Sequence, residues 1–221
     1  MKWLNKLERR YVRYAVKNLM LYIIGLNALI FVWVQIDPAA YHLLVLHPSL
    51  VLRGELWRLV TFIFIPPTFS PLWLIFTLYF YYLVGSGLEQ AWGSFKFNVY
   101  YLVGMIATIL AAFITGHGAT GVYLNLSLFF AFATLYPDFQ VLLFFILPVK
   151  VKYLAWLNAA FLGYTLLFSP WPSKVAALAS VLNYFIFFGE DIFRQAKLKN
   201  QVWRNRRRFF AEVNKARRNR K

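Results

Sequence analysis

Long runs of apolar residues, broken by proline, glycine and clusters of charge, dominate the pattern of this chain. Six runs come close to the roughly 20 mainly apolar residues that a helix needs to cross a bilayer. They cover residues 18–36, 71–89, 96–115, 121–136, 151–168 and 174–190. The breaks include Ile65-Pro66-Pro67 and Ser169-Pro170-Trp171-Pro172, which are typical of helix ends. The pattern predicts an all-α membrane protein with a bundle of six transmembrane helices.

Two other apolar stretches do not fit a transmembrane helix. The stretch from Phe139 to Leu147 lies between Pro137 and Pro148. It is too short to cross, and we expect an interfacial or re-entrant connection before the fifth helix. The loop from residue 37 to residue 70 is apolar, aromatic and punctuated by proline. We expect this loop to lie partly in the outer leaflet.

Charge fixes the expected orientation of the bundle. Hydrophobic residues make up 61% of the chain, above the roughly half that is usual in soluble domains. The net charge is +16, but the basic residues concentrate at the two ends and in short loops. With six helices, every Lys and Arg except Arg53, Arg58 and Lys174 falls on the side of the two termini. Because basic residues collect on the cytoplasmic side, we expect both termini in the cytoplasm.

The chain divides by composition into three parts. Residues 1–17 form a basic cytoplasmic segment, residues 18–190 form the membrane domain, and residues 191–221 form a basic tail. Apolar residues recur in the tail at loose helical spacing, which predicts an amphipathic helix on anionic lipid at the cytoplasmic face. The same residues would serve the alternative, contact with nucleic acid or a ribosome. The expected surface anchors are Arg204, Arg206, Arg207 and Arg208.

The absence of cysteine limits the possible chemistry. With no cysteine, the chain has no disulfide, no thiolate metal site and no cysteine nucleophile. There is no cluster of zinc ligands, so we expect no metal and no cofactor. The first apolar run lacks a cleavage site after it and is therefore expected to be a retained helix. Polar residues within the predicted helices are expected to bond helices to one another; they are Asn125, Ser127, Asn158 and Asn183.

Two motifs carry a family resemblance. The first loop reads Gly54-Glu55-Leu56-Trp57-Arg58-Leu59-Val60-Thr61-Phe62, and the second helix ends in Gly85-Ser86-Gly87-Leu88-Glu89-Gln90-Ala91-Trp92-Gly93. Together they resemble the rhomboid superfamily of intramembrane proteases, which has a six-helix core. The resemblance implies that Trp57 and Arg58 anchor a membrane-dipping loop, with Arg58 bonded to backbone carbonyls. It implies that Glu89 and Gly93 support the cytoplasmic end of the second helix. A plain snorkelling pair is the alternative for Trp57 and Arg58.

The catalytic groups implied by the resemblance are replaced. A rhomboid protease has a serine nucleophile on its fourth helix and a histidine base on its sixth. The only histidines here are His42, His47 and His117, and the Gly118-Ala119-Thr120-Gly121 segment has threonine in place of serine. A second alignment places Val122 at the position of the serine nucleophile. Trp73 and Thr77 stand where the family carries a histidine and an oxyanion-stabilising asparagine. We therefore expect no catalytic site. The remaining candidates are Thr120 as nucleophile with His117 as its base. Ser127 as a replacement nucleophile would lie too deep in the membrane.

The resemblance therefore implies a pseudoprotease that binds transmembrane segments of client membrane proteins without cleaving them. The alternative is an atypical intramembrane serine/threonine-type protease that uses Thr120 with His117. A transporter or channel comes third, because it would need ionisable residues inside the bundle and almost none lies between Lys96 and Asp138. The recruitment signals of derlins are missing, which favours a prokaryotic plasma membrane.

Overall fold

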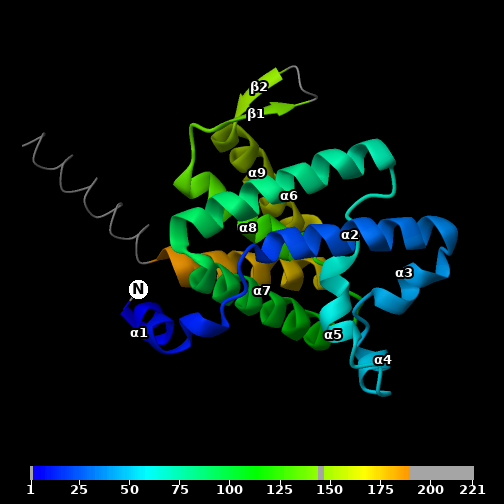
Figure 1. The fold of residues 1–221 in the computed structure, drawn as a ribbon. Helices are drawn as coiled ribbons and strands as arrows, with labels where there is room; N and C mark the ends of the chain where they lie inside the picture. Colours follow the sequence, from blue (N-terminus) through cyan, green and yellow to red (C-terminus); the bar gives the residue numbers. More distant parts are fainter. Residues whose placement is uncertain (1, 144–146, 190–221) are drawn as a thin grey trace, which may run out of the picture. The chain divides into compact units, whose positions relative to one another are not determined.

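The computed structural model describes residues 2–143 and 147–189 (Figure 1). The chain forms two compact units, residues 1–184 and residues 185–221. All the sites described below belong to the first unit. The predicted tail with Arg204, Arg206, Arg207 and Arg208 lies outside the described residues.

The main elements are long apolar helices. Within the described residues, five helices are long and apolar enough to cross a membrane. They are α2 (Leu19–Ile36), α6 (Pro71–Trp92), α7 (Ser94–Thr115), α9 (Val151–Phe168) and the helix Trp171–Gly189. The helix α8 (Val122–Leu135) is apolar but has only 14 residues. At 1.5 Å per residue, α8 is about 21 Å long, against roughly 30 Å of hydrocarbon.

Shorter elements fill the connections. The N-terminal segment contains α1 (Lys2–Tyr11) and the 3-10 turn η1 (Val12–Tyr14). The loop between α2 and α6 contains α3 (Ala39–Leu44), α4 (Pro48–Val51), α5 (Arg58–Thr61) and the 3-10 turn η2 (Phe62–Phe64). Between α8 and α9, strand β1 (Gln140–Leu143) pairs antiparallel with strand β2 (Leu147–Lys150).

Proline and glycine set the ends of the helices as the sequence indicates. Pro71 occupies the first turn of α6, where its missing N–H has no helical acceptor to lose. The helix α6 ends at Gly93, which has φ +82°, and α7 ends at Gly116, which has φ +70°. Both values lie in the region that glycine enters without steric cost.

The helices of the first unit alternate in direction. At one end, which we call the α1 end, Lys96 at the start of α7 forms an ion pair with Glu8 of α1 at 3.2 Å. The Asn98 amide there donates to the Val16 carbonyl at 3.1 Å. At the opposite end, which we call the α3–α5 end, Leu46 and Ala119 form an isolated β-bridge. This bridge joins the first loop to the α7–α8 connection.

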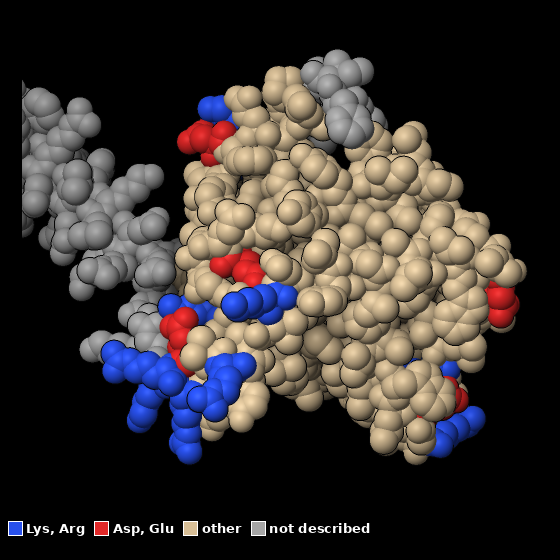
Figure 2. Space-filling model, in the orientation of Figure 1, with Lys and Arg blue, Asp and Glu red and all other residues tan. Residues whose placement is uncertain are grey.

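The surface of the unit suits a lipid environment. Large apolar side chains are widely exposed, including Leu29 of α2 at 67% and Trp156 of α9 at 76%. Figure 2 shows a wide uncharged face, with basic side chains gathered beside α1. The exposed basic residues of this segment are Lys6, Arg9, Arg10, Arg13 and Lys17. In water such an apolar surface would be unstable, whereas lipid tails cover it without cost.

The structure confirms a mostly helical membrane protein and changes two details. Helices form over all six predicted runs, but α8 falls short of a full span, so six crossings and the orientation of the termini stay predictions. The connection before α9 contains a β-hairpin, which the sequence analysis did not predict. Its apolar run of β-favouring residues bounded by prolines is consistent with a strand, but periodicity cannot distinguish it from a helix.

Candidate functional site

Arg58 is the centre of the loop at the α3–α5 end. Its side chain is 2% exposed, and its guanidinium bonds in three directions. Nη1 donates to the carbonyls of His42 at 2.6 Å and Val45 at 2.8 Å. Nε and Nη2 both lie 2.6 Å from Oε2 of Glu55. A buried cation is tolerated only with such partners.

The residues around Arg58 complete a cap on α3. The last carbonyls of a helix have no N–H donor inside the helix and need donors from outside it. Trp57 Nε1 donates to the Leu43 carbonyl at 3.3 Å, and Thr61 Oγ1 donates to the Leu44 carbonyl at 3.0 Å. With Arg58, side chains of a single short segment therefore satisfy the carbonyls of residues 42–45. Trp57 remains 51% exposed. Thr61 was not predicted as part of this cap, although its spacing of three from Arg58 places both residues on one helix face.

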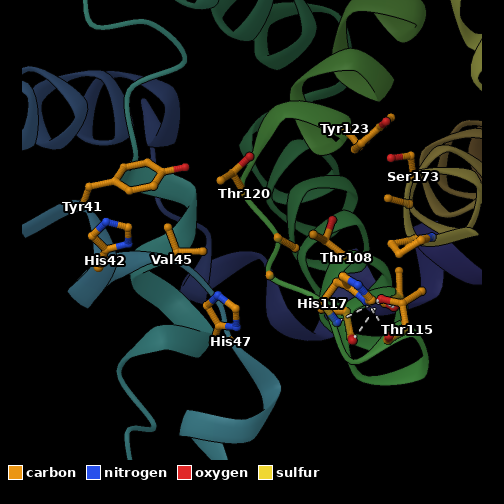
Figure 3. Close-up of a pocket in the computed structure, with 16 residues that line it drawn as sticks. Tyr41, His42, Val45, His47, Thr108, Thr115, His117, Thr120, Tyr123 and Ser173 are labelled. Atoms are coloured by element: carbon orange, nitrogen blue, oxygen red, sulfur yellow. Dashed lines mark hydrogen bonds between the residues drawn. The ribbon is translucent and has the colours of Figure 1, made fainter. Parts of the chain in front are cut away.

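A cavity of about 360 Å³ lies beside this loop, and all three histidines of the chain line it (Figure 3). The first loop supplies one wall with Tyr41, His42 and His47. The end of α7 and the α7–α8 connection supply a second wall, and the start of the helix Trp171–Gly189 supplies a third with Ser173. Within the described residues, no three His, Asp or Glu side chains lie close enough together to hold a metal ion.

Thr120 and His117 line the same cavity but do not pair. His117 Nδ1 lies 2.7 Å from the Thr115 carbonyl, and since a carbonyl only accepts, Nδ1 carries the hydrogen. In Figure 3 the Thr120 side chain lies apart from the His117 ring, and no hydrogen bond joins the two in the described part of the chain. The nucleophile and base of the alternative protease are therefore not joined by a hydrogen bond.

Ser127 lies deeper, in the centre of the unit. Its side chain is fully buried; Oγ donates to the Leu124 carbonyl at 2.8 Å and accepts from Asn183 Nδ2 at 3.0 Å. An amide cannot take a proton at neutral pH, so this pair joins two helices rather than activating the hydroxyl. The Asn158 amide instead donates to Leu154 of its own helix.

Glu89 and Gly93 lie at the α1 end, far along α6 from the cavity. Glu89 Oε1 accepts from the backbone N–H of Asn18 at 2.8 Å and from Ser94 Oγ at 2.6 Å. A carboxylate at the start of α2 also matches the positive end of that helix dipole. Gly93 provides the backbone conformation that separates α6 from α7.

Trp73 and Thr77 lie on α6 and line a second hollow. Thr77 Oγ1 donates to the Trp73 carbonyl of its own helix at 2.8 Å. An apolar groove of about 200 Å³ runs between this part of α6 and strand β1. Its lining residues are Trp73, Phe76, Thr77, Tyr79, Phe80, Val141 and Leu142. Neither Trp73 nor Thr77 lines the cavity that contains Thr120.

Comparison with known families places the chain. Residues 17–189 match the family described as eukaryotic integral membrane protein (DUF1751). The chain belongs to this family. No curated protein matches the chain significantly. The DUF1751 match covers the whole bundle from α2 to the helix Trp171–Gly189 and supports its assignment as an integral membrane protein.

The DUF1751 match corrects two expectations. The identification as an apparently prokaryotic member of the rhomboid superfamily was wrong, and so was the expected prokaryotic plasma membrane, because the matched family is described as eukaryotic. The motifs behind the resemblance have local structural causes. Arg58 caps α3, and Glu89 caps α2, and any bundle with a similar loop needs such groups.

Proposed function

We propose that this protein binds transmembrane segments of other membrane proteins without cleaving them, in the groove between α6 and β1. The observation that carries the proposal is the groove itself. It lies on a span helix, its lining is apolar and aromatic except for the Thr77 and Tyr79 hydroxyls, and Leu142 in the lining is 52% exposed. Helices associate in lipid through close packing and a few polar contacts, and this groove offers both.

The packing of α9 gives the groove room to accept a segment. Among the described elements, α9 packs against α8 and β2 and makes no extensive contact with α6. Most of its large side chains are exposed, including Leu157 at 68% and Phe161 at 62%. The side of α6 next to the hairpin is therefore not sealed by α9, and a foreign helix can reach Trp73 and Phe76 from the lipid.

The short helix α8 adds a second support. With a length of about 21 Å, it favours a locally thinner bilayer than the roughly 30 Å average. Thinning lowers the cost of a polar residue within a transmembrane segment, since water and headgroups come closer to it. We therefore expect the preferred clients to be segments with one or two polar residues.

The absence of cleavage belongs to the proposal. It rests on two observations: no hydrogen bond joins Thr120 to His117 among the described residues, and the Ser127 hydroxyl is bonded to the Leu124 carbonyl and the Asn183 amide, neither of which is a base. The threonine-type protease, which would use Thr120 with His117, has no observation in its favour beyond their common cavity.

The experiment uses the full chain in liposomes with synthetic transmembrane peptides. A photo-crosslinking residue replaces Leu142 at the groove, or Leu29 on the lipid-facing side of α2 as the matched control. A polyleucine peptide and the same peptide with one central asparagine are compared. We expect crosslinks from position 142 to the asparagine peptide, few crosslinks from position 29, and an intact peptide by mass spectrometry.

A groove-filling variant provides the decisive comparison. Thr77→Trp should lower the crosslinking yield at position 142 by about tenfold or more, because the packed volume is no longer open. Leu29→Trp should leave it unchanged. Equal yields at positions 142 and 29, or an unaffected yield in Thr77→Trp, would contradict binding in the groove. Peptide fragments that disappear with Thr120→Val would show the protease instead.

A further inference from the structure

The histidine-lined cavity at the α3–α5 end has no role in the proposed function and is a separate site. Its lining is rich in hydrogen-bond donors. Hydroxyls come from Tyr41, Thr120, Tyr123 and Ser173, and imidazole donors come from His42 and His47; the N–H of His117, which also lines the cavity, is bonded to the Thr115 carbonyl. Figure 3 shows these side chains distributed around the hollow from three different parts of the chain.

The charge of the lining selects the ligand class. None of the residues that line the cavity is Asp, Glu, Lys or Arg. A cation would therefore find no counter-charge, whereas an anion would meet hydroxyl and imidazole N–H donors and no repelling carboxylate in the wall. Arg58 lies directly behind this wall, with Nη1 bonded to the carbonyls of His42 and Val45. The Glu55 carboxylate offsets part of its charge from the far side.

Two helices also begin at the cavity. Tyr123 belongs to the first turn of α8, and Ser173 belongs to the first turn of the helix Trp171–Gly189. The N-terminal ends of helices carry partial positive charge and favour anions. This contribution adds to the side-chain donors and points to the same class of ligand.

The walls of the cavity are fixed before any ligand arrives. Leu46 and Ala119 exchange two backbone hydrogen bonds, of 3.2 and 3.0 Å, which tie the first loop to the α7–α8 connection. A Cβ at Gly118 would lie 3.0 Å from His47 Nε2, so glycine there permits the imidazole to approach the connection. The caps on α3 hold the other side of the loop. A preformed set of donors loses little freedom on binding.

We propose that this cavity binds the phosphate group of a lipid headgroup or of a soluble phosphate monoester. The hydroxyls and imidazoles contact the phosphate oxygens. Ala111, Ala112 and Ala176 form a small apolar part of the lining, where the carbon atoms next to the phosphate lie. The site lies at the α3–α5 end, so its occupant comes from the leaflet or compartment opposite α1.

The test measures binding of two probes to the full chain in detergent by isothermal titration. Glycerol 3-phosphate reports on a free phosphate monoester, and dihexanoyl phosphatidic acid reports on the same group with acyl chains. Saturable binding of both indicates recognition of the phosphate itself, and binding of the lipid alone indicates a headgroup site. Saturable binding of neither probe overturns the proposal.

Variants assign the binding to the cavity. The double variant His42→Leu with His47→Leu should weaken binding by about tenfold or more, because leucine offers the phosphate no hydrogen-bond donor. Ala176→Phe fills the hollow without removing a donor and should weaken binding to a similar degree. Arg53→Gln removes an exposed cation from the same end of the unit and should change affinity less than twofold. A greater loss with Arg53→Gln than with the cavity variants overturns the proposal, since it indicates surface charge alone.

Discussion

Because Arg58 caps α3, replacing this residue should destabilise the loop that contains α3 to α5. Arg58→Met keeps an unbranched apolar stem but removes the guanidinium, with its charge and all its donors. The change leaves the carbonyls of His42 and Val45, and the carboxylate of Glu55, without their partner. Removing one member of a buried ion pair typically costs about 3–5 kcal/mol. Each buried acceptor left without a donor costs about 1–3 kcal/mol, which agrees with that total.

The lack of cysteine in the chain provides a clean assay for this loss. Ala40 of α3 and Ala131 of α8 are both 0% exposed, so a single cysteine at either position reacts with a maleimide only after opening. A cost of about 3–5 kcal/mol, at 1.36 kcal/mol per decade, raises labelling at position 40 by about 10² to 10⁴-fold, up to the rate of an unprotected thiol. Labelling at position 131 should change much less, because the bundle does not depend on the loop.

Arg53→Met is the matched control, since Arg53 is an exposed cation in the same loop. It should change labelling at position 40 by less than about threefold, as is usual for surface substitutions. An Arg58→Met protein that labels at the parent rate would refute the reasoning. It would mean that the bonds around Arg58 do not hold the loop.

Three further predictions follow from other contacts. Glu89→Gln should lower the free energy of unfolding in SDS titrations by about 1–2 kcal/mol, because the charge-assisted bond from the Asn18 N–H is lost. The control is Glu8→Gln, which breaks the partly exposed ion pair with Lys96 and should lower the free energy of unfolding by less than about 1 kcal/mol. Gly85→Ala places a Cβ against Cγ of Met20 and should cost about 1–3 kcal/mol, whereas Gly163→Ala, with nothing within 4 Å, should be neutral in the same titration. Hydrogen bonds from Lys152 and Lys150 lower the pKa of Asp138 in the folded protein. The ionised carboxylate therefore stabilises the hairpin fully at pH values above the unfolded-state pKa of Asp. This contribution is lost as the pH falls through the lowered folded-state pKa. Amide exchange of Val151, corrected for intrinsic rates, should therefore speed up at acid pH in the parent and not in Asp138→Asn; the same acceleration in both proteins would contradict this role.

The helices were predictable from the sequence because their signals are local. A run of apolar residues that ends in Pro or Gly specifies both the helix and its end, and α7 and α9 begin and end within two residues of the predicted bounds. The length of α8 could also be predicted from the sequence, but whether a helix of this length crosses the membrane could not. The number of crossings depends on how the bilayer adapts to a helix of this length.

The candidate sites were less predictable because they depend on contacts between distant segments. His42, His47 and His117 are up to 75 positions apart in the chain, and the bridge between Leu46 and Ala119 brings their loops together. The groove depends on the hairpin, whose strands have no periodic signature in so apolar a run. The family resemblance failed for a related reason, since capping residues such as Glu89 recur wherever a helix end needs an acceptor.

Both proposals depend on the α3–α5 end and the α1 end facing opposite sides of the membrane, and one measurement tests this most directly. Single cysteines replace Arg13, Ser94, Arg53 and, in the tail outside the described residues, Asn214. Sealed vesicles are then treated with an impermeant maleimide. The account predicts that positions 13, 94 and 214 label from one side and position 53 only from the other. Labelling of position 53 from the same side as position 94, or of positions 13 and 214 from opposite sides, would contradict it.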